Sequence, residues 1–168
     1  REKVQINSED MDRFFDVLKE IDTAREADAS RRPIVVGVGG RTSAGKTTAV
    51  IAKIQEQFPD RVGVISTDDF AKGAEFVEKV LDDGGEINYD HPDYYDTGLA
   101  REKILDLIDG AKSVEIPVFN FQKGRGEPDG TQQFDARDIV VVEGLYALST
   151  DLQDLFDMKA FVDISQHG

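Results

Sequence analysis

The most informative part of this sequence is Gly40-Arg41-Thr42-Ser43-Ala44-Gly45-Lys46-Thr47. It fits the phosphate-loop pattern G-x-x-x-x-G-K-[ST], whose glycines let the backbone wrap around phosphate groups. The strand-like segment Ile34 to Val38 precedes it, and a helical pattern follows from Gly45 to Phe58. A helix that begins at such a loop directs free N–H groups and the positive end of its dipole at a bound anion. The sequence therefore predicts a phosphate site between a strand and a helix.

The residues of this loop have separate expected tasks. Lys46 bridges the β- and γ-phosphates of a nucleoside triphosphate, ATP or GTP, and the Thr47 hydroxyl ligates Mg²⁺. Thr48 adds a phosphate contact one position further along the helix. The other expected phosphate contacts are Gly40, Thr42, Ser43, Ala44 and Gly45. A dinucleotide-binding loop is excluded, because Gly37-Val38-Gly39 lacks the third glycine at the required offset.

Strand-like and helix-like segments alternate through the rest of the chain. This pattern predicts an α/β fold of the P-loop NTPase type, a mostly parallel sheet with helices on both faces. Ile139 to Val142 is an uninterrupted apolar run, as expected of a strand buried on both faces. The other expected elements are strands at 62–66, 114–121 and 160–164, helices at 72–81 and 97–110, and a loop at 123–130. Pro117 indicates an edge or bulged position, and Asp96 or Thr97 is expected to cap its helix.

The first part of the chain predicts an amphipathic helix at residues 8–29, with Ser8 as its N-cap. Its apolar side chains recur at helical spacing, which favours packing on a core over binding a partner. These residues are Met11, Phe14, Phe15, Leu18 and Ile21. A polar segment ending at Pro33 follows. We therefore divide the chain into an N-terminal helix and linker at 1–32 and a P-loop core at 33–168.

Acidic residues follow two of the expected strands. Asp68 and Asp69 come after the strand at 62–66 and should emerge beside the phosphate loop, where a carboxylate can accept the proton of an attacking hydroxyl and share the metal. The alternative is that one of them caps a helix. Glu143 follows the buried run 139–142, at the edge where doubly wound sheets bind ligands. It can hold Mg²⁺ or its water, or be a polar strand end without a ligand.

Composition limits the partners of this chain. Its 34 acidic and 20 basic residues give a net charge of −14, which disfavours nucleic acid and anionic membrane surfaces. Without cysteine it has neither disulfides nor thiolate zinc sites, and no run approaches the roughly 20 apolar residues that span a bilayer. We expect a cytoplasmic protein with small-molecule partners, and self-association stays open. Because the chain starts at Arg1 and ends after an expected strand, we also expect it to be part of a longer protein.

Several motifs in order resemble the uridine kinase and phosphoribulokinase superfamily, with uridine-cytidine kinases as the nearest pattern. The resemblance extends from about Ile34 to Asp163. Its elements are Gly40 to Thr48, Ser66-Thr67-Asp68-Asp69-Phe70, Asn88-Tyr89-Asp90-His91-Pro92-Asp93, Ile116 to Phe121, Val142-Glu143-Gly144 and Phe161-Val162-Asp163. It implies a kinase that uses Mg²⁺ and ATP, or GTP, to phosphorylate a hydroxyl of a small molecule, with Asp68 as the catalytic base.

The same resemblance implies an acceptor site. Asp90 matches the sugar-hydroxyl ligand of the family, with Tyr89 and His91 beside it, and the segment 88–95 has a composition suited to binding a ring and its hydroxyls. A rim of packed aromatic residues is the alternative. Phe119 is expected to help position the acceptor, and Arg125 either joins it or is a solvated charge.

The chain departs from uridine kinases where the acceptor is chosen. Those kinases usually have an aromatic residue at Ala71, a tyrosine at Phe119 and a histidine at Gly124. A nucleoside is our first expectation, and pantothenate, glycerate or a sugar phosphate are alternatives. From another class, a nucleotide-binding regulatory module that phosphorylates no acceptor also stays open. Family kinases carry an arginine-bearing lid after the last strand, where only Ser165 to Gly168 remain here, so we expect poor turnover by the chain as given.

Overall fold

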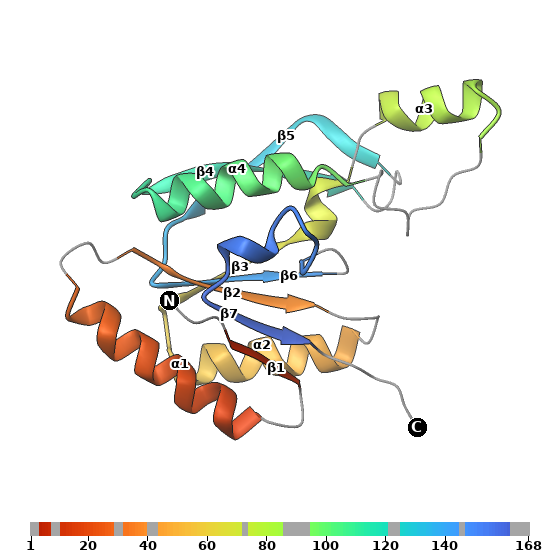
Figure 1. The fold of residues 1–168 in the computed structure, drawn as a ribbon. Helices are drawn as coiled ribbons and strands as arrows, with labels where there is room; N and C mark the ends of the chain where they lie inside the picture. Colours follow the sequence, from red (N-terminus) through yellow and green to blue (C-terminus); the bar gives the residue numbers. More distant parts are fainter. Residues whose placement is uncertain are drawn as a thin grey trace, which may run out of the picture.

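The computed structural model describes residues 4–7, 11–28, 32–39, 44–71, 74–85, 95–120, 125–144 and 147–161. Five parallel strands form the main sheet (Figure 1). In spatial order they are β1 (Val4–Asn7), β7 (Met158–Phe161), β2 (Ile34–Gly39), β6 (Ile139–Glu143) and β3 (Val62–Ser66). The predicted α/β fold with a mostly parallel sheet is confirmed. The strand β1 was not predicted.

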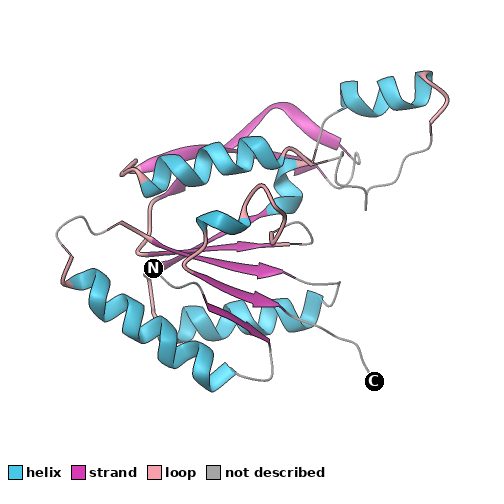
Figure 2. Cartoon of the chain, in the orientation of Figure 1, coloured by secondary structure: helices cyan, strands magenta, loops and turns pink. Residues whose placement is uncertain are grey.

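Helices cover both faces of this sheet, as Figure 2 shows. On one face lie α1 (Met11–Glu26) and α2 (Ala44–Gln57). On the other lie α4 (Thr97–Ile108) and an antiparallel ribbon made of β4 (Ser113–Asn120) and β5 (Arg125–Asp135). The helix α3 (Ala74–Asp82) extends away from the sheet in Figure 1. Of two short 3₁₀ helices, η2 (Thr67–Phe70) directly follows β3, and η4 (Gln153–Leu155) lies between β6 and β7 in the sequence.

Side chains of the central strands β2 and β6 belong to two separate apolar clusters, because successive side chains of a strand point to opposite faces. Val36 and Val141 join the cluster under α1 and α2, which we call the α1–α2 core. Val35 and Val140 join the cluster under α4 and β4, the α4–β4 core. All four are fully buried. The continuous apolar run that predicted a strand buried on both faces is thereby explained.

The helix α1 packs its apolar stripe on the sheet, as expected. Phe14 and Leu18 are completely buried, and the ring of Phe14 meets that of Phe15 edge to face at a centroid distance of 5.5 Å. The predicted cap Ser8 lies outside the described residues. At the start of α4 the cap is Asp96, whose Oδ1 accepts a hydrogen bond from the Leu99 amide at 2.9 Å.

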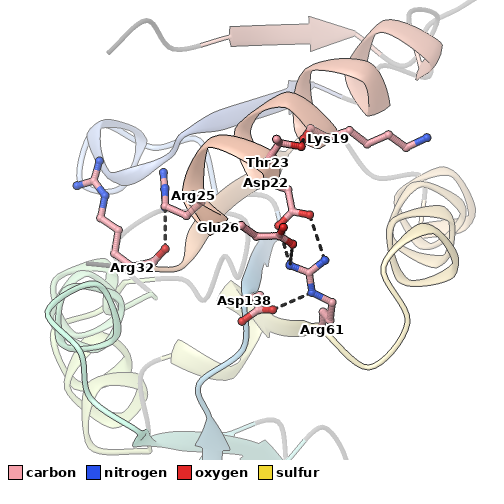
Figure 3. A network of polar contacts seen from close by, with 8 residues as sticks. All are labelled: Lys19, Asp22, Thr23, Arg25, Glu26, Arg32, Arg61 and Asp138. Carbon is pink, nitrogen blue, oxygen red and sulfur yellow. Dashed lines mark hydrogen bonds and ion pairs between the residues drawn. The ribbon is translucent and has the colours of Figure 1, made fainter. Parts of the chain in front are cut away.

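Arg61 and Arg25 connect α1 to the amino ends of the strands through hydrogen bonds and ion pairs. Arg61, just before β3, donates to both carboxylate oxygens of Asp22 in α1, at 2.6 and 3.1 Å, and to Asp138 before β6 at 2.7 Å (Figure 3). Arg25, at the end of α1, donates to the carbonyls of Arg32 and Pro33 and to the Asp157 carboxylate. This end of the sheet is therefore tied together by structural contacts.

The predicted loop at 123–130 is wrong from Arg125 onward, because this part of the chain begins β5. Its backbone is paired with β4, with Asn120 opposite Arg125 and Ser113 opposite Asp135. Glycines and a proline gave the segment the composition of a loop, whereas its hydrogen-bond partners come from another strand. The irregularity expected at Pro117 is confirmed by a register shift between Pro117 and Phe119. In the described part of the chain, no helix is both long and apolar enough to cross a membrane.

Candidate active site

The carboxyl ends of β2, β6 and β3 meet at one edge of the sheet, because the strands are parallel. Glu143 ends β6, opposite Val38 of β2 on one side and Ser66 of β3 on the other. The strand order corrects one expectation: β6 lies between β2 and β3, so Asp68 is one strand away from the segment that follows β2. Glu143 is the nearer of the two acids to the strand that leads into the phosphate motif.

The second half of the phosphate motif, Ala44 to Thr47, forms the first turn of α2. A helix therefore begins within one residue of its predicted start, and its free N–H groups lie at this end. Thr48 is exposed on the helix. The predictions for Gly40, Thr42 and Ser43, and for the side chains at 44–47, fall outside what the structure describes.

Asp68 lies in η2, directly after β3. The N-cap of this short helix is Ser66, whose Oγ accepts a hydrogen bond from the Asp68 amide at 3.2 Å. Ser66 thus has the capping role that we had considered for the aspartates. Burial raises the pKa of the Asp68 carboxyl above its usual value of 3.8. A half-buried carboxylate whose pKa is raised is suited to accept a proton.

Glu143 is half-buried and lies near two other acidic residues. Its pKa is raised mainly by burial and also by the charges of Asp68 and Asp69, while a hydrogen bond from the Ser66 side chain lowers it. Two like charges near a half-buried carboxylate are unfavourable unless a cation offsets them. The edge formed by Glu143 and Asp68 is therefore a favourable place for a positive ion.

Gly144 and Thr67 lie against each other just after the ends of β6 and β3. Gly144 has φ +130°, which L side chains rarely adopt, and faces the Oγ1 atom of Thr67. Thr67 is 2% exposed, and among the described residues its hydroxyl has no hydrogen-bond partner. An unpaired buried hydroxyl is unfavourable. Sequence reasoning missed Ser66 and Thr67; the preference of serine for N-caps was the available signal for Ser66.

The carboxylates of Asp68 and Glu143 fit a magnesium site in which a bound nucleotide supplies further ligands. Mg²⁺ is usually held by one or two protein carboxylates together with substrate phosphates and water. Asp68 and Glu143 offer such oxygens at one edge. Among the described residues, no cluster of three or more histidine, aspartate or glutamate side chains is arranged to hold a metal on its own.

The expected acceptor residues are only partly described. Tyr89, Asp90 and His91 lie outside the described residues, and Phe119 and Arg125 are placed by their backbones alone, in β4 and β5. Ala71 and Tyr95 form an antiparallel bridge, and the Asp96 amide donates to the Phe70 carbonyl at 2.8 Å. The chain that follows the expected acceptor segment is therefore bound to the end of η2, which carries Asp68.

Comparison with known proteins identifies the family. The model of the phosphoribulokinase / uridine kinase family matches residues 35–167, which includes the phosphate motif, Asp68 and Glu143. This chain belongs to that family. The match covers most of the sequence, including β2, β3, β6 and β7, and it confirms the expected superfamily.

Members of the phosphoribulokinase / uridine kinase family resemble this chain in both sequence and fold. A uridine kinase of Streptococcus agalactiae is 38% identical over 138 residues, which are 79% of this chain and 62% of that protein. The chloroplastic uridine/cytidine kinase UKL1 of Arabidopsis thaliana is 34% identical over 139 residues, 80% of this chain and 28% of that protein. The chain thus spans less than two thirds of the length of either relative.

The fold of a solved structure agrees with this family. The structure of a possible uridine kinase from Bacillus stearothermophilus superposes with a TM-score of 0.63 at 17% identity, covering 91% of this chain and 83% of the other. At this identity the likeness establishes the fold alone, and the predicted P-loop kinase fold is thereby confirmed.

Proposed function

We propose that this chain forms the core of an ATP-dependent kinase that transfers the γ-phosphoryl group to a hydroxyl of a nucleoside. The observation that carries the proposal is that Glu143, Asp68 and the carboxyl end of β2, which precedes the phosphate motif in the sequence, lie at one edge of the sheet. Family membership and the uridine kinases among its relatives support a hydroxyl acceptor.

The nucleotide is assigned to the phosphate loop. Lys46 and the loop amides from Gly40 to Thr48 hold the phosphates of ATP, or of GTP. Thr47, Glu143 and Asp68 hold Mg²⁺, which neutralises charge on the phosphates when bound. The negative environment of Glu143 supports this assignment, because a bound cation relieves it.

The acceptor is assigned to the side of Asp68 that faces away from the nucleotide. Asp68 takes the proton of the attacking hydroxyl, and its half-buried position supports this role because its raised pKa makes it a stronger base than an exposed aspartate. Tyr89, Asp90 and His91 bind the sugar, and Phe119 with Arg125 complete the pocket. The bridge between Ala71 and Tyr95 supports this arrangement, since it joins the end of the expected acceptor segment 88–95 to the residue that follows η2.

Release of ADP in the presence of different acceptors tests the proposal. Purified protein with Mg-ATP should release ADP faster when uridine or cytidine is added, and a Lys46→Met control should lose that activity. Stimulation by pantothenate, glycerate or a sugar phosphate instead would replace the nucleoside while keeping the kinase. Tight nucleotide binding that no acceptor affects would contradict the kinase and support a nucleotide-binding regulatory module.

A further inference from the structure

Two glycines of β2, Gly37 and Gly39, have no task in the proposed phosphate site, yet each has a close neighbour. They lie on the same face of the strand, because successive residues of a strand alternate between faces. A Cβ atom on Gly37 would overlap the ring of Phe156, and one on Gly39 would lie 2.7 Å from Cγ and 3.0 Å from Cδ1 of Leu148. The lack of a side chain at both positions therefore lets another segment lie directly on the backbone of β2.

That segment is the chain between β6 and β7, which we call the β6–β7 connection and which the structure describes at residues 147–157. It crosses the sheet on the side of α4 (Figure 1). Phe156 is fully buried in the α4–β4 core, and Leu148 is partly buried against it. The β6–β7 connection is thus part of the packing on this face of β2.

Leu148 contacts β2 at the point where the strand ends and the phosphate motif begins in the sequence. Gly39 is the last residue of β2, and Gly40 is the first residue of the motif. On one face of the sheet, the fully buried side chain of Val38 holds the strand end in the α1–α2 core. On the other face Gly39 has no side chain, so Leu148 packs against its backbone instead. The end of β2 is therefore held between two apolar side chains.

A glycine at this position benefits from such a contact, because without a Cβ atom its backbone has a wider range of conformations. A phosphate loop binds an anion through backbone N–H groups that point at it, and such groups must stay within about 0.5 Å of their productive positions. Movement of Gly39 would displace Gly40, the next residue of the chain. A side chain that limits this movement can therefore affect phosphate binding without touching the phosphates.

We propose that Leu148 is a positioning residue, whose side chain holds the end of β2 in place and thereby aligns the phosphate motif for nucleotide binding. The proposal rests on the proposed function, which assigns the nucleotide to this motif. Leu148 acts through Gly39 and contacts neither the nucleotide nor the acceptor in this role. The alternative is that Leu148 only fills space beside the α4–β4 core. In that case its removal lowers stability but leaves the nucleotide affinity of the folded protein unchanged.

An exchange of volume between Gly39 and Leu148 tests the contact. Gly39→Ala adds a methyl group in the space of the Leu148 side chain, whereas Leu148→Ala empties that space and leaves a Cβ atom 3.4 Å from the added methyl, an ordinary contact. We expect each single variant to bind a fluorescent, non-hydrolysable ATP analogue with Mg²⁺ about tenfold more weakly than wild type. Because the two changes share one space, the double variant should bind within about threefold of wild type. Leu148→Met, which conserves volume, should also stay within about threefold.

Leu107→Ala in α4 is the matched control, because it removes the same atoms from a leucine of the same core. Leu107 is 2% exposed, more deeply buried than Leu148, so its replacement should lower the melting temperature at least as much. It should leave the affinity for the analogue unchanged. Circular dichroism confirms that each variant is folded at the temperature of the titration.

Wild-type affinity in the folded Leu148→Ala variant would overturn the proposal, as would an equal loss of affinity in Leu107→Ala. Losses that multiply in the double variant would also overturn it, because they would show that the two groups do not share one space. If Gly39→Ala does not fold, the affinities of Leu148→Ala and Leu148→Met decide.

The same titration separates this proposal from the proposed function. A wild-type protein that binds no nucleotide analogue would reject both of them. Binding by the wild type without acceptor-dependent ADP release would reject the kinase alone, and the comparison of Leu148→Ala with Leu107→Ala would still decide the role of Leu148.

Discussion

A methyl group on Gly144 would collide with the Oγ1 atom of Thr67, where β6 and β3 end side by side. We predict that Gly144→Ala lowers the free energy of unfolding by about 2–5 kcal/mol, from the strain at φ +130° together with the overpacking. Urea denaturation measures this loss.

Two further variants show whether the collision is the cause. Thr67→Ala removes the atom that a methyl group would meet, so Gly144→Ala should cost less in that background, although the strain at φ +130° stays. Gly98→Ala in α4 is the control, because the nearest atom to an added Cβ there lies 3.6 Å away. Equal costs of Gly144→Ala with and without Thr67 would show that the contact is unimportant.

We predict that Asp68→Asn lowers kcat about 10²–10⁴-fold while leaving ATP affinity nearly intact, because an amide cannot accept the proton of the acceptor hydroxyl. The measurement is steady-state kinetics together with nucleotide titration. In the wild type, activity should fall as the pH drops through the raised pKa of Asp68, above the usual 3.8. Full activity in the Asp68→Asn variant would remove Asp68 from the mechanism.

The Asp68→Asn variant should be more stable than the wild type, although it is less active. Burial raises the pKa of Asp68, so the folded protein binds this proton more tightly than the unfolded chain, and the ionised group opposes folding at neutral pH. Asp68→Asn should therefore raise the melting temperature at pH 7. The gain should shrink as the pH falls through the folded pKa towards 3.8. A variant less stable than wild type at pH 7 would contradict this prediction.

The buried ion pair between Arg25 and Asp157 should contribute strongly to stability. The pair is 3.1 Å apart with side chains 7% and 13% exposed, and Asp157 also accepts the Val35 amide at 2.9 Å. We predict that Asp157→Ala costs about 3–5 kcal/mol, because it leaves the buried charge of Arg25 without a carboxylate and the Val35 amide without its acceptor. Thermal and urea denaturation measure the cost. In contrast, breaking the exposed pair of Arg101 and Asp154 should shift the transition little.

Arg61→Lys tests whether the geometry of the guanidinium matters as well as its charge. A lysine cannot contact both carboxylate oxygens of Asp22 while also donating to Asp138. We predict a loss of about 1–3 kcal/mol in the free energy of unfolding, equivalent to one or two hydrogen bonds between charged groups. Unchanged stability would mean that charge alone is sufficient.

Elements whose own residues specify them were predictable from the sequence. The apolar run at 139–142 matches β6, and the predicted bounds 62–66 match β3. The ribbon strand β5 was missed, because its polar residues 125–133 carry no alternating apolar pattern and its order comes from pairing with β4. Likewise the four residues of β1 are specified by the edge of β7, a partner more than 150 positions away.

For the candidate site, it was easier to predict which residues take part than which of them lie side by side. Asp68 and Glu143 were identified because strand-end carboxylates near a phosphate motif have a chemical use. That Glu143 and Asp68 follow adjacent strands was not predictable, since it depends on β6 lying between β2 and β3. Strand order of this kind is decided by the packing of the whole domain. The local sequence around Asp68 contains no signal for it.

The α1–α2 core and the α4–β4 core share no residue, although both rest on β2 and β6. The phosphate motif opens α2 on one side, whereas the ribbon with Phe119 and Arg125 lies on the other. Changes that remodel the ribbon layer can therefore leave the packing beneath the nucleotide loop intact. On the proposed function, a fold divided in this way lets acceptor preference diverge during evolution while phosphate chemistry is preserved, which offers a route to redesigning the substrate by exchanging a single layer.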